Sequence, residues 1–309
     1  MFHIVTDSGA QDIASDSLVT VVPNRLLVDG KTLLEGVDIS SSDVLRLIES
    51  RPGDVRLTAP TAADFTATYR KLIGTTKGII SIHMGKNLFK SYSAGRQAAL
   101  QLVGHAKIEV IDSMSVAYAQ TLLVQTAKEA IQQGESFEEI VRQVRGAVGR
   151  IYAVFFTESL EWLLRRAVET ASSGSALAPE TPGSGEASSA APRMMSASHV
   201  VLSAMLGVKP ILSIENGELV PIEKVRTRLQ AVERLVEFAV EFDQSIKIMI
   251  MSCKTGKTGE TQRMLLDRLQ QEFPDRTIRQ IPYCPALAAL LGVDAIGLII
   301  LESETENES

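Results

Sequence analysis

Apolar runs and amphipathic stretches alternate along the first half of the chain. Compact runs rich in Val, Ile and Leu, typical of buried strands, occupy residues 2–6, 18–27, 78–83 and 108–111. Helical periodicity or Ser and Asp capping signals occupy residues 40–49, a stretch beginning near Ser91, and residues 115–133. This alternation predicts a mostly parallel sheet covered by helices, which we assign to an N-terminal α/β domain over residues 1–150.

The pattern changes in the second half of the chain. Strand-like runs with hairpin-like or helical connections occupy residues 152–156, 211–214, 218–222, 246–251 and 295–301. Strands that follow one another in this way favour a second domain of the α+β type, over residues 151–301. The expected fold class is therefore α/β with two domains.

Two segments lack the composition of a packed core. Residues 171–191 are nearly all Ser, Ala, Gly, Pro, Thr and Glu, so they cannot bury enough apolar area to offset their ordering entropy. We predict a flexible insertion there. Residues 302–309 are acidic and end the chain, which predicts a disordered tail.

The composition sets limits on the class of protein. With 309 residues and 45% apolar content, the chain can bury a substantial core, and this length usually divides into about two domains. The net charge is -6, so we expect no broad basic surface for nucleic acid.

No apolar run approaches the roughly 20 residues needed to cross a bilayer, and the N-terminus lacks the pattern of a signal peptide. The cysteines, Cys253 and Cys284, are far apart and lack metal or redox spacing, which agrees with a reducing compartment. We therefore expect a cytoplasmic protein without an integral membrane segment.

One short motif resembles part of a phosphate-binding loop. The stretch Lys254-Thr255-Gly256-Lys257-Thr258 has the end of that motif, but Met251 stands where the first glycine is required. A mobile loop between a strand and a helix is the favoured interpretation.

The remaining candidate chemistry is sparse. His3, His83, His105 and His199 are scattered without metal-ligand spacing, so we expect no metal site. Asp7 and Ser8 end the first strand and have two interpretations: contacts to a ligand beyond the strand's carboxyl end, or turn bonding and helix capping. A nucleophilic Ser8 would need an adjacent base, and the sequence indicates none.

Several phrases in fixed order carry more information than any single motif. They are Ile4-Val5-Thr6-Asp7-Ser8, Gly36-Val37-Asp38-Ile39-Ser40, Asp64-Phe65, Val110-Ile111-Asp112-Ser113, Lys209-Pro210-Ile211-Leu212, Glu215-Asn216-Gly217-Glu218 and Lys224-Val225-Arg226-Thr227. Their order and spacing resemble the DegV family of bacterial fatty-acid-binding proteins across nearly the whole chain.

The resemblance implies two α/β domains with a long apolar tunnel for an acyl chain and polar groups for its carboxylate. It also implies a non-enzymatic lipid carrier without a cofactor, which binds a fatty acid or related acyl lipid. In bacteria with a fatty acid kinase, such a protein presents the acid to a separate ATP-using subunit, so such a kinase is a candidate partner.

Two alternatives come from other classes of protein. One is a regulatory or interaction protein that kept the fold and lost fatty acid binding. The other is a kinase-like phosphotransferase, suggested by a partial likeness of the family's second domain to dihydroxyacetone kinases. The second would need carboxylates that bind metal around a phosphate loop.

The resemblance places the candidate ligand-binding residues in short loops: Thr58, Thr61, Gly85, Lys86, Ser91, Arg193 and Arg226. Three polar groups of the family pattern are replaced here. Leu57 stands for the first residue of Thr-Ser-Gln-Pro-Ser, Lys86 and Phe89 replace serines of Ser-Ser-x-x-Ser-Gly-Thr-Tyr, and Leu290 stands for the histidine of His-x-Gly-Pro-Gly.

Two head-group chemistries remain open. Lys86, Arg193 and Arg226 could bind an anionic head group through charge-assisted hydrogen bonds. Alternatively, the three apolar replacements line a mouth for a neutral or larger lipid. Lys86 could also be a solvated loop residue, and Arg226 could belong to a surface ion pair.

Overall fold

The computed structural model describes residues 1–13, 16–158, 209–242, 246–253 and 258–303. The described helices are α1 (Ser41–Ser50), α2 (Ala62–Leu72), α3 (Ser91–Leu100), α4 (Tyr118–Gln132), α5 (Phe137–Val148), α8 (Arg228–Val240), α9 (Gly259–Glu272) and α10 (Pro285–Leu291). None of these described helices combines the length and the apolar composition needed to span a membrane.

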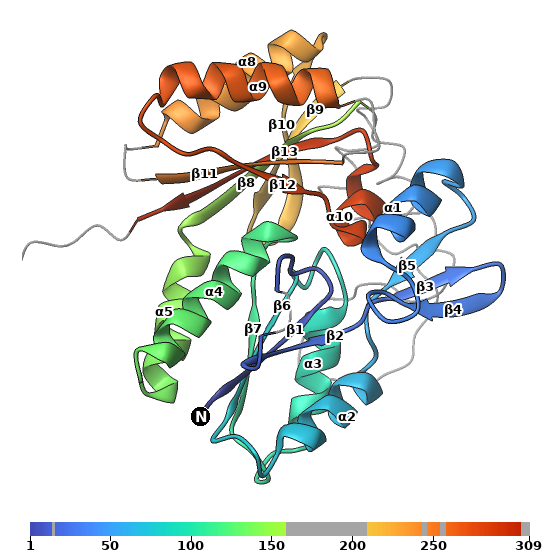
Figure 1. The fold of residues 1–309 in the computed structure, drawn as a ribbon, viewed down its shortest axis with the longest axis vertical. Coiled ribbons are helices and arrows are strands. Elements are labelled where there is room, and N and C mark those ends of the chain that lie inside the picture. The colour runs from blue at the N-terminus through green and yellow to red at the C-terminus, as the bar shows by residue number, and fades with distance from the viewer. Residues whose placement is uncertain (14–15, 159–208, 243–245, 254–257, 304–309) are drawn as a thin grey trace, which may run out of the picture.

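The first sheet is parallel throughout, as the sequence predicts. Its strands are β1 (His3–Asp7), β2 (Val19–Val22), β6 (Ile79–His83) and β7 (Ile108–Asp112), in the order β2-β1-β6-β7. Because successive strand residues point to opposite faces, Ile4 packs under α4 and α5, whereas Val5 packs under α2 and α3. Helices therefore cover both faces of this sheet (Figure 1).

The strand predicted over residues 18–27 is wrong in one respect, because it forms two strands in different sheets. β2 ends at Val22, and β3 (Arg25–Val28) pairs antiparallel with β4 (Lys31–Leu34) and β5 (Arg56–Thr58). Pro23 lacks a backbone N–H, and the N–H of Asn24 donates to Ser8 Oγ at 3.0 Å. Neither residue continues the ladder of the parallel sheet.

The second sheet is mainly antiparallel and follows the order β10-β9-β8-β13-β11-β12. Its strands are β8 (Ile151–Phe156), β9 (Lys209–Glu215), β10 (Glu218–Val225), β11 (Ile246–Ser252), β12 (Arg279–Pro282) and β13 (Ile296–Glu302). Asn216 and Gly217 join β9 to β10 with φ values of 52° and 78°, as a tight hairpin turn requires. The strands predicted for this half are confirmed, and the whole is a two-domain α/β fold.

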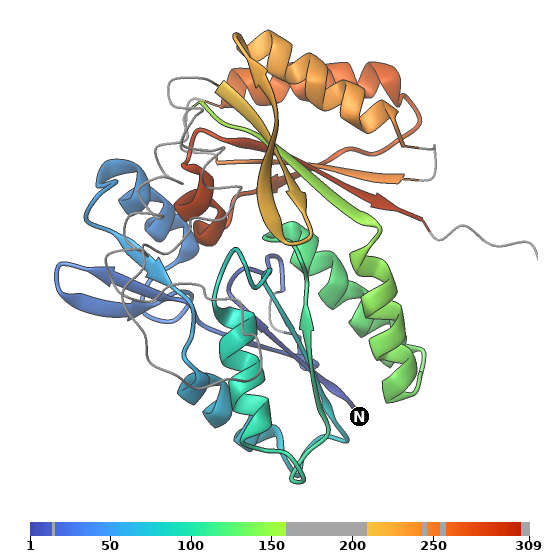
Figure 2. The same ribbon diagram turned by 180° about the vertical axis from the view of Figure 1, so that it is seen from behind.

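The two faces of the second sheet have different partners. Val154 and Phe156 point toward α8 and α9, whereas Ala153 and Phe155 point the other way, into a cluster shared with the first domain. Figures 1 and 2 show α8 and α9 on the outer face and α10 on the inner side. The apolar core of the C-terminal domain therefore continues into the N-terminal domain.

The predicted insertion, residues 171–191, lies outside the described residues. Of the predicted tail, Glu302 ends β13 and its backbone N–H donates to Arg150 O at 3.0 Å, while residues 304–309 lie outside the described part. The boundary between the domains at residue 150 stays a prediction.

Candidate functional site

The carboxyl ends of the parallel strands face the second domain. β1, β6 and β7 end at Asp7, His83 and Asp112, and the loops that follow them lie against the C-terminal domain. Polar contacts cross there: Gln11 Nε2 donates to Pro282 O at 2.6 Å, and Asn87 Nδ2 donates to Glu218 Oε1 at 3.2 Å. Ligands of parallel sheets bind at this edge, so the seam between the domains is the candidate site.

An apolar cluster, called here the interdomain cluster, fills this seam. From the N-terminal domain it contains Met84, Leu88, Phe89, Val116, Tyr118 and Leu122 among others. From the C-terminal domain it contains Phe155, Leu212, Met251, Tyr283, Leu287 and Leu290 among others. A surface of this composition suits an acyl chain, because it offers dispersion contacts and few polar groups.

The three apolar replacements of the family pattern meet in this cluster. Phe89 and Leu290 are each 3% exposed, and Leu57 packs against the cluster while partly buried. Residues from β5, from the loop after β6 and from α10 thus come together across the seam. Which of the two head-group chemistries the seam serves stays a prediction.

A fully buried polar network lies under the carboxyl edge. His83 Nδ1 lies 3.1 Å from Asp7 Oδ2, and His83 Nε2 lies 2.7 Å from Ser81 Oγ. Ser81 Oγ in turn lies 2.7 Å from the hydroxyl of Tyr69. Gln120 Nε2 donates to Thr6 Oγ1 at 2.8 Å and so ties α4 to β1. Both ring nitrogens of His83 are engaged, which makes it a positioning residue for the edge.

The same contacts bear on the two interpretations of Asp7 and Ser8. Asp7 Oδ1 accepts a hydrogen bond from Gly9 N at 2.8 Å, and Ser8 Oγ accepts one from Asn24 N at 3.0 Å. Turn bonding therefore accounts for both side chains. Asp7 is wholly buried beneath the loop that it shapes.

A second buried acid, Glu35, was not predicted from the sequence. Its carboxylate accepts hydrogen bonds from Asn24 Nδ2 at 3.1 Å and from Ser41 Oγ at 2.9 Å. Burial raises its pKa to about 7, with Asp7 contributing in the same direction. Burial raises the pKa of the Cys284 thiol to about 12, and the charges of Glu35 and Asp7 act in the same direction. In the sequence, only the position of Glu35 directly before the motif Gly36-Val37-Asp38-Ile39-Ser40 could have drawn attention to it.

Several buried polar atoms of the described residues have no hydrogen-bond partner. They are the hydroxyls of Ser91, Ser115, Tyr118 and Tyr283 and the amide oxygens of Gln11, Asn24 and Gln120. An unpaired buried polar group costs about 1–3 kcal/mol, so such groups are candidates for contact with a ligand. Most of them belong to elements that border the seam.

Two of the predicted ligand-binding residues have structural contacts. Thr61 caps α2: its hydroxyl accepts from Asp64 N at 3.3 Å, and its N–H donates to Asp64 Oδ2 at 2.7 Å. Thr58 is exposed and donates to Arg25 O at 3.3 Å. Arg25 of β3 and Asp64 of α2 form an ion pair at 2.7 Å, which joins the three-stranded sheet to α2.

The predicted residues after β6 lie at the seam. Gly85 is buried and its N–H donates to Ser115 O at 2.8 Å, so the loops after β6 and β7 are in contact. A Cβ at Gly85 would lie 3.3 Å from backbone atoms of Met114 and Ser115, which favours glycine there. Ser91 begins α3 and is buried, whereas Lys86 is exposed.

Two of the predicted basic residues, Lys86 and Arg226, lie near opposite ends of β10. Lys86 adjoins Asn87, which contacts Glu218 at the start of β10, whereas Arg226 follows the last residue of that strand. Along β10, the backbone of Arg226 lies at most about 25 Å from that of Glu218, at 3.3 Å per residue. Arg226 is exposed, and Arg193 lies outside the described residues.

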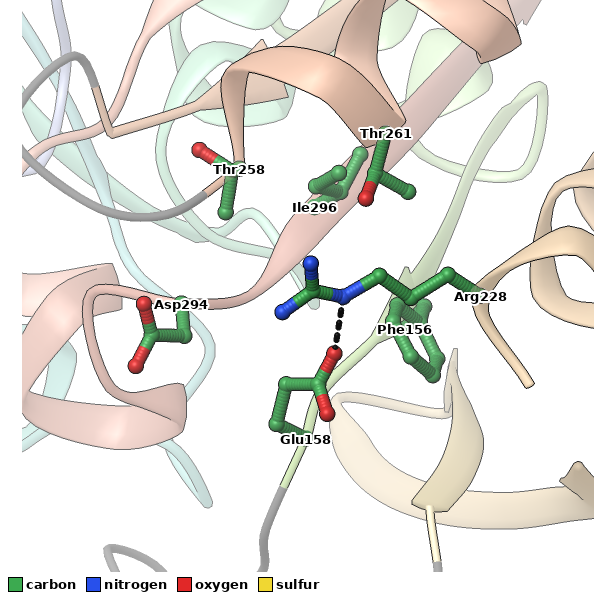
Figure 3. Close-up of a pocket in the computed structure, with 7 residues that line it drawn as sticks. All are labelled: Phe156, Glu158, Arg228, Thr258, Thr261, Asp294 and Ile296. Carbon is green, nitrogen blue, oxygen red and sulfur yellow. Dashed lines mark hydrogen bonds and ion pairs between the residues drawn. The ribbon is translucent and has the colours of Figure 1, made fainter. Parts of the chain in front are cut away.

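A small charged pocket lies within the C-terminal domain, lined by Phe156, Glu158, Arg228, Thr258, Thr261, Asp294 and Ile296 (Figure 3). Arg228 Nε donates to Glu158 Oε1 at 2.6 Å, and Lys209 Nζ donates to Glu158 Oε2 at 2.5 Å. Although burial raises the pKa of Glu158, these hydrogen bonds outweigh it and lower that pKa. The protein's own ion pairs therefore fill the pocket.

The threonine of the partial phosphate-loop motif borders this pocket. Thr258 precedes α9 and its hydroxyl donates to Cys253 O at 3.1 Å, while residues 254–257 lie outside the described part. Of the residues that the structure describes, no group of three His, Cys, Asp or Glu side chains could hold a metal ion.

The fold and the seam define a class: a two-domain α/β protein with an apolar interface between a parallel and a mainly antiparallel sheet. A family model described as "Uncharacterised protein, DegV family" matches residues 1–303. The chain belongs to the DegV family.

Relatives and solved structures agree with this assignment. A DegV domain-containing protein, TTE1491, from Caldanaerobacter subterraneus is 27% identical over 97% of this chain and 98% of its own. The fatty acid binding DegV family protein SAG1342 from Streptococcus agalactiae has 18% identity and a TM-score of 0.79, over 98% of this chain and 99% of its own. The Fatty Acid Kinase (Fak) B3 protein of Streptococcus pneumoniae, loaded with linoleic acid, has 18% identity and a TM-score of 0.74, over 98% of this chain and 100% of its own.

Proposed function

We propose that this protein is a carrier for a fatty acid or a related single-chain acyl lipid, bound along the seam between its domains. The observation that carries the proposal is the interdomain cluster, a continuous set of apolar side chains from both domains at the carboxyl edge of a parallel sheet. Two structural counterparts are described by the fatty acids that they bind or were loaded with, and their folds match nearly the whole chain.

The protein acts by binding rather than by catalysis. At the seam, Asp7, Ser8 and His83 are engaged in turn bonds and in the buried network around His83, which supports this proposal. A separate fatty acid kinase is the partner suggested by the counterpart from Streptococcus pneumoniae. The two cysteines are buried and form no disulfide, which supports a cytoplasmic location.

Mass spectrometry of the purified protein tests this function. Denaturing extraction of freshly purified protein should release one single-chain lipid per chain, and native spectra should show the same mass bound. Consistently lipid-free protein, with no thermal shift on adding long-chain acids, alcohols or monoglycerides, would favour a regulatory protein that has lost its ligand.

A pair of matched variants tests whether the lipid binds at the seam. Met251 lies in the interdomain cluster, and Met264 packs against the outer core beneath α8 and α9. Met251→Trp should fill the seam and lower the bound lipid several-fold, whereas Met264→Trp adds the same bulk elsewhere and should leave it unchanged. Overpacking destabilises by typically 1–3 kcal/mol, so thermal melting of both variants serves as the folding control.

A further inference from the structure

We propose that the groove between β10 and α8 binds an arginine side chain from a basic segment of a partner protein. The groove has a volume of about 210 Å³ and is lined by Val154, Ile211, Ile222, Glu223, Arg234, Glu237, Phe238 and Glu241. It lies on the outer face of the second sheet, where Val154 and Ile211 belong to the core beneath α8 (Figures 1 and 2). This face is turned away from the seam, so the groove is separate from the proposed lipid site.

The floor of the groove is apolar. Val154 and Ile211 are buried, and Phe238 of α8 packs against the same cluster while partly buried. The ring of Phe238 meets that of Phe242 in a T-shaped arrangement, with 5.2 Å between the ring centres. The methylene stem of an arginine can lie along such a floor while its charged end stays at the rim, and the face of an aromatic ring attracts a guanidinium.

A β-bulge turns an extra apolar side chain toward the groove. The register between β9 and β10 shifts between Pro221 and Glu223, so Ile222 is the extra residue. In a regular strand Ile222 and Glu223 would point to opposite faces of the sheet, yet both line the groove. Ile222 is 47% exposed, and an apolar residue next to the bound arginine can cover this surface.

The rim of the groove is acidic. Among the described residues that line it, three are glutamates and one is an arginine, which gives a net charge of −2. Arg234 pairs with Glu223 at 2.9 Å and also with Glu237, so one guanidinium serves two carboxylates. Glu241 adds the third carboxylate. The rim therefore complements a positively charged side chain.

Two of these carboxylates lie where a cation is favoured. Glu237 belongs to the last turn of α8, and Glu241 follows that helix as its C-cap residue. The helix dipole makes this end negative, so acids are unfavourable there and a bound cation offsets them. Arginine fits better than lysine, because its planar guanidinium can form paired, charge-assisted hydrogen bonds with carboxylates.

Paired peptides test the proposal. An array of short peptides would carry a central arginine beside an apolar residue among varied flanking residues, and each peptide would have a twin with citrulline in place of the arginine. Citrulline keeps the shape of the side chain and removes its charge. The labelled full-length protein should bind a subset of the arginine peptides roughly tenfold more tightly than their twins, and salt should reduce the difference. If no arginine peptide binds more tightly than its twin, the proposal is overturned.

Variants of the groove show whether the peptides bind there. Glu241→Gln removes one charge of the rim and should weaken binding of the arginine peptides roughly tenfold without changing that of their citrulline twins. Glu272→Gln is the matched control, because it makes the same change at the exposed end of α9, outside the groove, and it should leave both unchanged.

A second pair of variants tests the apolar contact. Ile222→Ala should weaken both members of each peptide pair, whereas Leu229→Ala, at an exposed residue of α8 that does not line the groove, should weaken neither. Thermal melting of all four variants serves as the folding control. Arginine peptides that bind Glu241→Gln or Ile222→Ala as tightly as wild type would place the binding site elsewhere and overturn the proposal.

Discussion

A single buried side chain, Glu35, makes the stability of the folded protein depend on pH. Its folded-state pKa of about 7 lies above the value of 4.5 for an unperturbed glutamate, because burial disfavours the charged form. The folded protein therefore holds this proton more tightly than the unfolded chain does. The stability that this provides is complete below about pH 4.5 and is lost as the pH rises through about 7.

Replacing the acid with its neutral isostere should remove this dependence. Glu35→Gln should be more stable than wild type at pH 8, by up to about 3 kcal/mol at 1.4 kcal/mol per pKa unit, and similar to it at pH 4.5. The introduced glutamine should also be tolerated sterically, because its amide can donate to Asn24 Oδ1, which has no partner in wild type. Urea denaturation of both proteins at several pH values measures the difference. A stability difference that does not vary with pH would contradict the assignment. Asp38→Asn makes the same charge change at an exposed residue and should show neither effect.

The buried polar residues mark the limit of prediction at this scale. The sequence indicated that Asp7 ends a strand and that His83 lacks metal-ligand spacing. It could not show that these two side chains, 76 positions apart along the chain, are in direct contact. The burial of Glu35 likewise depends on a small sheet whose partners come from three separate segments. The apolar replacements at Leu57, Phe89 and Leu290 were visible because a family pattern gave each position an expected residue.

At the scale of elements, the order of strands and helices was largely predictable because each carries its own periodicity. The division of residues 18–27 between two sheets was not, since Val, Leu and Arg residues on both sides of Pro23 suit either sheet. The helix predicted from residue 115 begins instead at Tyr118, because the preceding residues form the loop after β7. Tertiary contacts decide such boundaries.

The ends of the segment between β8 and β9 are held together. Val154, Phe155 and Phe156 pair antiparallel with Ser213, Leu212 and Ile211, and Glu158 forms an ion pair with Lys209 at 2.5 Å. The two ends of the segment between residues 158 and 209 therefore lie next to each other. Shortening such a segment costs little, because loop-closure entropy depends only weakly on length.

Deletion of residues 171–191 with direct joining of the ends should accordingly change the free energy of unfolding by less than about 1 kcal/mol. Thermal and urea denaturation of the shortened protein measure this. Lipid release on extraction should be measured in parallel, because a large loss of stability or of bound lipid would mean that the segment packs as a lid over the seam. A deletion of the same length cannot be matched elsewhere in the chain, so wild type is the reference.

At the scale of the whole molecule, the two domains that the sequence predicted separately share one apolar cluster at the seam. The apolar runs predicted two layered domains, yet alternate residues of β8 and β11 serve two different clusters, one within a domain and one between domains. Periodicity shows that both faces of a strand are buried, but not what covers each face. The family resemblance supplied the expectation of a ligand between the domains, and the packing of the seam supports it.

If lipid binds in the seam, it should stabilise both domains together, because the folded state alone offers the complete site. At a free ligand concentration of 100 times the dissociation constant, the gain is about 2.7 kcal/mol. Hydrogen exchange should therefore slow on adding hexadecanoic acid to delipidated protein, most strongly in α10 and in the loops after β6 and β7. Peptides from α5 and α9, which pack against other clusters, provide the internal control for local protection. Slower exchange confined to one domain would place the lipid outside the seam, since a ligand held by both domains must protect elements of both.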